Sequence, residues 1–238
     1  MNLSLIIVVG AALLLVLIVV LTVKGRQKKQ EASAKRARSL GFQLLEEVPI
    51  QLQERMEKLV SRGSGKRLEL RSVYQQRGFD QDFYLVDVKE HGDDQVSWMG
   101  PETMVVISSR LALPRFTVIS LPETGEGGVV EGLAEKMLDQ VMQWLGKTRG
   151  LNQVVFPDQP EFQRRFGLLA RNEQSVRHFF SRHLTQYLIQ MNQAMGIEAE
   201  GDFFAVSLTS PGEKPDGDPL QDLYRTARDL ARAFKTGA

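Results

Sequence analysis

Side chains that could do chemistry gather in one segment of this sequence, Gln159 to His183, which holds two histidines, five arginines and two glutamates. Imidazole and carboxylate groups serve as general acids, general bases and metal ligands, and guanidinium groups bind anions. The spacing of these residues decides which of these chemistries the segment supports.

The two histidines, His178 and His183, do not suit a metal site on one helix. They are five positions apart, so their side chains diverge by about 140°, whereas paired helical zinc ligands are usually four apart. The sequence also contains no cysteine and no HExxH motif. We therefore expect no metal ligands and no metal cofactor.

A helix is expected from about Glu173 to Met195, and packing explains most of its sequence. Its apolar stripe consists of Val176, Phe179, Phe180, Leu184, Tyr187, Leu188 and Met191. On a helix, His183 lies about 60° from the centre of this stripe, at the margin of the core. His178 lies about 160° away, in solvent or against a partner.

Two carboxylates three positions apart, Asp158 and Glu161, have two interpretations. They could act as an acid and base pair. They also match a capping box, in which Asp158 caps a short helix that includes Pro160, and Glu161 occupies its third position. We favour the structural interpretation because the spacing fits the capping signature.

The basic residues of the segment, together with His178, form a candidate interaction patch: Arg164, Arg165, Arg171, Arg177, His178 and Arg182. The simplest interpretation is a solvated surface. The alternative is a docking patch for an acidic partner, since arginine forms bidentate contacts with carboxylates.

Other motifs for cofactor chemistry are missing from the sequence, which has no GxGxxG, GxxxxGK[ST] or GxSxG. A GSGK run at residues 63–66 lacks the first glycine and the following Ser or Thr of a phosphate loop. We therefore assign no catalytic residue, no cofactor-binding residue and no cofactor.

Residues 3–23, LSLIIVVGAALLLVLIVVLTV, form an uncharged apolar run of 21 residues. As a helix it measures about 31 Å, which matches the hydrocarbon core of a bilayer. A cleaved signal peptide would have a basic start and a shorter apolar core. The run predicts a single transmembrane anchor in residues 1–23, with the lipid bilayer as its partner.

Basic residues directly follow this run, and residues 24–38 carry a net charge of +6. The four nearest the membrane are Lys24, Arg26, Lys28 and Lys29. Positive flanks stay on the cytoplasmic side, so we expect the N-terminus outside the inner (plasma) membrane and the later domain in the cytoplasm. A lipid or nucleic-acid patch is the alternative interpretation. We expect no nucleic-acid partner, because the rest of the chain carries a net charge of −5.

The remaining chain predicts an α+β fold: a basic juxtamembrane segment at 24–48 and a domain at 49–238, with a possible subdivision near 125–150. Helical periodicity indicates helices at 49–61, 133–145 and 219–234, the last capped by Asp218. Alternation and short links indicate a mostly antiparallel sheet. The expected strands are 67–74, 82–90, 95–99, 103–109, 115–121, 152–156, 167–170 and a hairpin over 197–210 that turns at Gly201.

Three stretches, LPRFTVISLPE, VVFPDQPEFQRRFGLLARNEQSVRHFFS and GIEAEGDFFAVSL, resemble a group of uncharacterised bacterial membrane-anchored proteins. The resemblance covers roughly residues 40–235. It implies one or two N-terminal membrane helices and a soluble domain, and it implies no activity for any residue.

Two classes of function remain open at this stage. The first is a single-pass membrane protein whose cytoplasmic domain is a non-enzymatic interaction or sensing module with a protein partner at the membrane. The second is a membrane-tethered hydrolase-type enzyme whose residues come together only in the fold. We favour the first, because packing and topology explain the patterns above.

Overall fold

The computed structural model describes residues 31–60, 67–91, 102–121, 140, 142–147, 149–191, 193–208 and 218–236. Residues 43–238 form one compact unit, and the segment up to Phe42 is a separate one. Residues 31–39 of that segment are helical. The predicted anchor at 3–23, the basic residues Lys24, Arg26, Lys28 and Lys29, and the expected strand at 95–99 lie outside the described residues.

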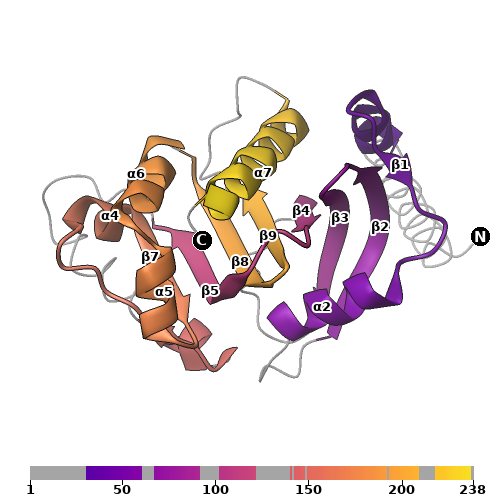
Figure 1. Cartoon of the computed structure of the whole chain (residues 1–238). Coiled ribbons are helices and arrows are strands. Elements are labelled where there is room, and N and C mark those ends of the chain that lie inside the picture. Colours follow the sequence, from indigo (N-terminus) through magenta and orange to yellow (C-terminus); the bar gives the residue numbers. More distant parts are fainter. Residues whose placement is uncertain are drawn as a thin grey trace, which may run out of the picture. The chain divides into compact units, whose positions relative to one another are not determined.

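The compact unit is an α+β fold, as the sequence predicts (Figure 1). Its elements follow in chain order: β1 (Gln43–Leu44), α2 (Ile50–Val60), β2 (Arg67–Arg77), β3 (Asp82–His91), β4 (Glu102–Ile107), β5 (Leu113–Ser120), β6 (Asn152–Gln153), α4 (Pro160–Arg165), β7 (Phe166–Ala170), α5 (Glu173–Phe179), α6 (Arg182–Met191), β8 (Met195–Gly201), β9 (Phe203–Leu208) and α7 (Pro219–Thr236).

The strands of the described residues form one sheet, in the order β1-β2-β3-β4-β9-β8-β5-β7-β6, and every paired neighbour is antiparallel. The hairpin β8–β9 inserts between β4 and β5, which are consecutive in sequence. Its turn has Gly201 at φ +66°, a backbone conformation that favours glycine. The predicted hairpin at this position is confirmed.

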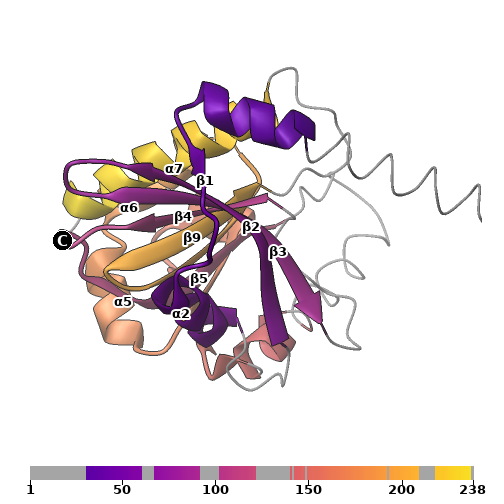
Figure 2. The ribbon, with the colours of Figure 1, turned by 90° about the vertical axis from the view of Figure 1, so that its right-hand side faces the viewer.

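The sheet has an apolar core on each face, because successive strand residues point to opposite sides. Phe203 packs in a core with α2 and the helical residues near Leu145. Its neighbour Phe204 instead contacts Phe234 of α7, at 5.1 Å between ring centroids. Figure 2 shows α7 and α2 on opposite sides of the strands. The two faces therefore bury two separate sets of side chains.

The C-terminal helix confirms its predicted start and stripe. The Leu220 amide donates to the Asp218 carboxylate at 3.1 Å, which satisfies one of the free amides of the first turn. The predicted stripe is buried throughout: Leu220, Leu223, Ala227, Leu230, Ala231 and Phe234.

The expected single helix from Glu173 to Met195 is wrong, since the chain forms α5 and α6 there and Met195 begins β8. The Phe180 amide still bonds to the Val176 carbonyl at 2.8 Å, but Phe180 has a non-helical backbone (φ −80°, ψ 66°). The Ser181 hydroxyl then accepts from the Leu184 amide at 3.4 Å and begins α6. Phe179 and Phe180, at this break, are both buried.

The predicted capping box on α4 is also wrong. The residue before the helix is Gln159, which makes no capping hydrogen bond through its side chain. Its side-chain oxygen instead accepts from the Thr185 hydroxyl of α6. Asp158 lies in an exposed turn, and Glu161 is exposed in the first turn of α4. Pro160 at the helix start has no amide hydrogen, so one of the unsatisfied N–H groups of the first turn is absent.

The helix expected to end at Gly146 continues, with residues 142–147 and 149 helical. It ends where Gly150 adopts φ +62° and the Leu151 amide bonds to the Gly146 carbonyl at 2.9 Å. These features match a Schellman ending. Arg149 is thereby fixed at the end of the helix, against the sheet.

None of the helices in the described ranges is both long and apolar enough to cross a bilayer.

Candidate functional site

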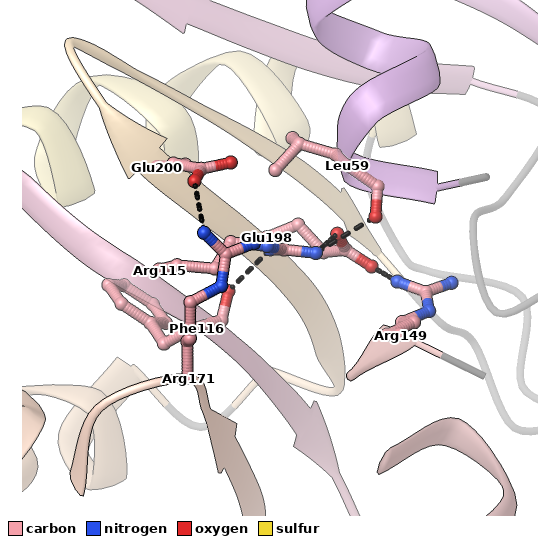
Figure 3. A network of polar contacts seen from close by, with 7 residues as sticks. All are labelled: Leu59, Arg115, Phe116, Arg149, Arg171, Glu198 and Glu200. Carbon is pink, nitrogen blue, oxygen red and sulfur yellow. Dashed lines mark hydrogen bonds and ion pairs between the residues drawn. The ribbon is translucent and has the colours of Figure 1, made fainter. Parts of the chain in front are cut away.

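A buried ionic network joins the middle of the sheet to two helices on one of its faces (Figure 3). Glu198 of β8 is fully buried and pairs with two arginines. Arg115 of β5 lies 2.8 Å from one carboxylate oxygen, and Arg149 pairs with the other. Three charged side chains from distant parts of the chain therefore meet in a position from which water is almost excluded.

Arg115 is held by further hydrogen bonds. Its guanidinium donates to the Leu59 carbonyl of α2 at 2.8 Å and to the Phe116 carbonyl at 3.1 Å. The Leu59 carbonyl is near the end of α2, where helical carbonyls lack partners within the helix. Arg115 therefore connects α2 to the sheet as well as to Glu198.

Burial lowers the pKa of Arg115 to about 10, and the nearby Glu200 carboxylate acts in the opposite direction. The side chain remains a cation at neutral pH. Arg115 and Arg149 share the Glu198 carboxylate. Buried charges of this kind are costly unless they are paired.

A second, more exposed pair lies beside this network. Arg171, the residue after β7, is 3.3 Å from the Glu200 carboxylate of β8, and both side chains are partly exposed. Glu200 is two residues from Glu198, so both project from the same face of β8. The Arg171 amide also bonds to the Arg115 carbonyl at 3.2 Å. The exposed pair is therefore tied to the buried one through the backbone.

An open pocket of about 560 Å³ lies where β5, β8 and α5 meet. Its polar lining consists of Arg115, Arg171, Asn172, Ser175, His178 and Glu200. Its apolar lining consists of Ala112, Leu113, Pro114 and Phe179. Mixed lining of this kind, with a few convergent polar groups, is typical of ligand sites.

The lining of the pocket contains one histidine, His178. His178 is exposed, and no described residue hydrogen-bonds to its imidazole. A catalytic histidine usually has a second group that orients it. No group of three or more potential metal-ligating His, Cys, Asp or Glu residues occurs in the described part of the chain. Arginine, serine and asparagine at the rim suit recognition of an anion.

No family model matches the sequence, and no curated protein matches it. Among solved structures, the crystal structure of the mycobacterial trehalose monomycolate transport factor A, TtfA, is similar at a TM-score of 0.45 and 12% identity. The match covers 83% of this chain and 90% of that chain. At this level of similarity, the function of TtfA is not transferred to this chain.

The residues of the predicted interaction patch make different contacts. Arg171 and His178 line the pocket. Arg165 donates to the Ile189 carbonyl at 2.8 Å and so connects α4 to α6. Arg177 pairs with Glu173 at 2.7 Å and also donates to a backbone carbonyl.

The other members of the patch, Arg164 and Arg182, are exposed and do not line the pocket. Asp158 and Glu161 also lie outside it. His183 is exposed, although the sequence predicted a place at the margin of the core. The reason is the break at Phe180, which rotates α6 relative to a continuous helix.

Four residues of the network were missed by sequence reasoning: Arg115, Arg149, Glu198 and Glu200. A signal was present, because Arg115 and Glu198 each place a charge inside a mostly apolar strand. Charged residues are almost never fully buried unless they are paired. Nothing in the sequence, however, indicated which partner each of them would have.

Proposed function

We propose that this chain is a single-pass membrane protein whose cytoplasmic domain is a non-enzymatic binding module for a protein partner. The apolar run at residues 3–23 is its anchor, and the pocket between β5, β8 and α5 is its binding site. The observation that carries the proposal is the pocket itself. Arg171 and His178 are accessible in it, and hydrogen bonds of the neighbouring Arg115 hold the backbone of Arg171 in place.

The fixed position of Arg115 beside the pocket supports a role in binding. Arg115 is fixed by contacts to α2, β5 and β8, and its carbonyl in turn accepts from the Arg171 amide. Side chains held on a fixed backbone lose less conformational entropy when a partner binds. The pocket is therefore pre-organised for a ligand.

Site-specific crosslinking in native membranes tests the binding site. A photoreactive residue at Ser175, which is exposed at the pocket rim, should capture one partner. The matched control is the same residue at Gln221, which is exposed on α7 and outside the pocket. Arg171→Ala should remove the Ser175 product. Equal capture from both positions, or capture that Arg171→Ala leaves unchanged, would contradict the proposed site.

A reporter fused after Ala238 tests the orientation separately. The positive charges after residue 23 predict cytoplasmic activity of the reporter. A reporter active only in the exported compartment would contradict the cytoplasmic location.

A further inference from the structure

The charge balance of the pocket region favours an anion. Two of the ionic side chains that line the pocket, Arg115 and Arg171, are cations, and Glu200 is an anion. The charged part of the lining therefore has more positive than negative groups. Because Arg115 is buried, water screens its charge less than it would at the surface.

Arg115 also has capacity for a further interaction. Its Nη atoms bond to Leu59, Phe116 and Glu198, but its buried Nε has no hydrogen-bond partner within the described residues. Arg115 is a lining residue of the pocket. An anion in the pocket would therefore lie near a buried guanidinium group that has one unused N–H donor.

Donor groups at the rim suit the oxygen atoms of an anion. The Asn172 side-chain oxygen accepts from the Ser175 amide at 3.0 Å, which leaves its NH₂ group as a donor. The Ser175 hydroxyl and the Arg171 guanidinium are further donors on the same rim. The only anionic side chain in the lining is Glu200, and Arg171 pairs with it at 3.3 Å.

A ligand carboxylate can bind Arg171 in place of Glu200, or beside it, at little cost in free energy. Both side chains are partly exposed, at 46% and 31%, and exposed pairs at such distances contribute little stability. Arg171 carries five N–H donors and uses one of them on Glu200. It can thus bind a second carboxylate without losing a strong interaction.

The remaining lining of the pocket restricts the ligand further. Ala112, Leu113, Pro114 and Phe179 provide an apolar wall. A small inorganic anion would leave this wall in contact with water, whereas an apolar group beside the charge would cover it. The pocket therefore suits a ligand with a charged head and an apolar body.

We infer that this pocket binds a ligand in which a carboxylate is attached to an apolar group, and that Arg171 binds the carboxylate. The inference rests on the proposed binding function and names the ligand chemistry of the same pocket. The carboxylate has two possible sources, an acidic side chain next to an apolar residue of a partner, or a free amphiphilic acid.

Ligand-observed NMR on the full-length protein in lipid nanodiscs tests this inference with defined probes. Phenylacetate should bind, and its neutral isostere phenylacetamide and inorganic phosphate should each bind at least about tenfold more weakly. Arg171→Ala should weaken phenylacetate binding about tenfold or more. Arg171→Lys should weaken it less, because lysine keeps the positive charge and loses only the bidentate geometry.

Arg164→Ala is the matched control, since Arg164 is exposed but outside the pocket. It should change phenylacetate binding by less than about twofold. Equal binding of phenylacetate and phenylacetamide, or stronger binding of phosphate, would overturn the inference. Equal losses with Arg171→Ala and Arg164→Ala would also overturn it.

The source of the carboxylate is distinguished by a second pair of probes. If the ligand is a partner side chain, acetyl-Phe-Glu-amide should compete with phenylacetate and acetyl-Phe-Gln-amide should not. If the ligand is a free acid, phenylacetate should bind and neither peptide should compete. Capture from Ser175 that depends on Arg171, without binding of any carboxylate probe, would overturn the ligand class and leave the proposed function standing.

Discussion

Arg115 and Glu198 are 83 positions apart in sequence, and their side chains meet at 2.8 Å between Nη2 and Oε2 on the neighbouring strands β5 and β8. Both are buried, and each belongs to a strand whose other side chains are mostly apolar. The pair fixes the end of α2 through Leu59 and places Arg149 beside the same carboxylate. The geometry of the pocket therefore depends on contacts made in the interior.

Truncation at Ser39 should yield a soluble protein with one cooperative unfolding transition. Residues 43–238 form a compact unit with a core on each face of its sheet, so this unit should not need the anchor to fold. Sedimentation after removal of membranes, together with urea unfolding followed by two probes, checks this. A truncated protein that stays with the membrane fraction, or that unfolds without a transition, would contradict the prediction.

Glu198→Gln should destabilise the truncated protein by about 3–5 kcal/mol, because it leaves two buried guanidinium groups without their counterion. Its matched control is Glu200→Gln, which removes the exposed partner of Arg171 and should cost less than about 1 kcal/mol. Urea denaturation at neutral pH measures both. Similar costs for the two substitutions would mean that the buried network does not carry the stability assigned to it.

Asp80 should make stability depend on pH at the acidic end. A hydrogen bond from the Lys235 side chain is the main cause that lowers the pKa of Asp80 below 3.8, and the charges of Lys235 and Arg110 act in the same direction. A lowered folded-state pKa means that the stabilisation is present above 3.8, the unperturbed value, and is lost as the pH falls through the folded-state pKa.

A double-mutant cycle of Asp80→Asn and Lys235→Met measures this interaction in the truncated protein. The coupling energy should be favourable at neutral pH, and it should shrink as the pH falls from 3.8 through the lower folded-state pKa of Asp80, where the folded carboxylate becomes protonated. A coupling energy that grows on acidification would show that the sign of the pKa shift is wrong.

Local signals predicted much of the fold. The turn at Gly201 predicted the β8–β9 hairpin, and Asp218 with the apolar stripe after it predicted α7. Such features depend on neighbours within a few residues, so their physical causes are visible in the sequence. The placement of this hairpin between β4 and β5 could not be predicted, since it depends on which strand edges remain free after folding.

Most of the candidate site could not be predicted from the sequence either, because it depends on which distant segments come together in the fold. The pattern around His178 drew attention to the correct helix, and Arg171 and His178 do line the pocket. The buried ionic network beside the pocket joins Arg115, Arg149 and Glu198 from three separate segments. No spacing rule relates such residues, because antiparallel pairing and the end of a helix bring them together.

Phe180→Ala should be the most damaging substitution within the segment from Gln159 to His183. Phe180 is buried, and its ring lies 4.9 Å from Phe116 and 6.2 Å from Phe162, measured between centroids. Removing the ring leaves a cavity between α5 and the sheet, which should cost about 3–5 kcal/mol. Thermal or urea unfolding of the truncated protein measures this loss.

His178→Ala and His183→Ala are the controls for this substitution, because both imidazoles are exposed. Each should cost less than about 0.5 kcal/mol. Since His178 lines the pocket and His183 does not, only His178→Ala should alter capture of a partner from Ser175. A loss of stability with His178→Ala as large as that with Phe180→Ala would mean that α5 is rotated from the orientation described above. Unchanged stability combined with lost capture would assign His178 to binding and not to packing.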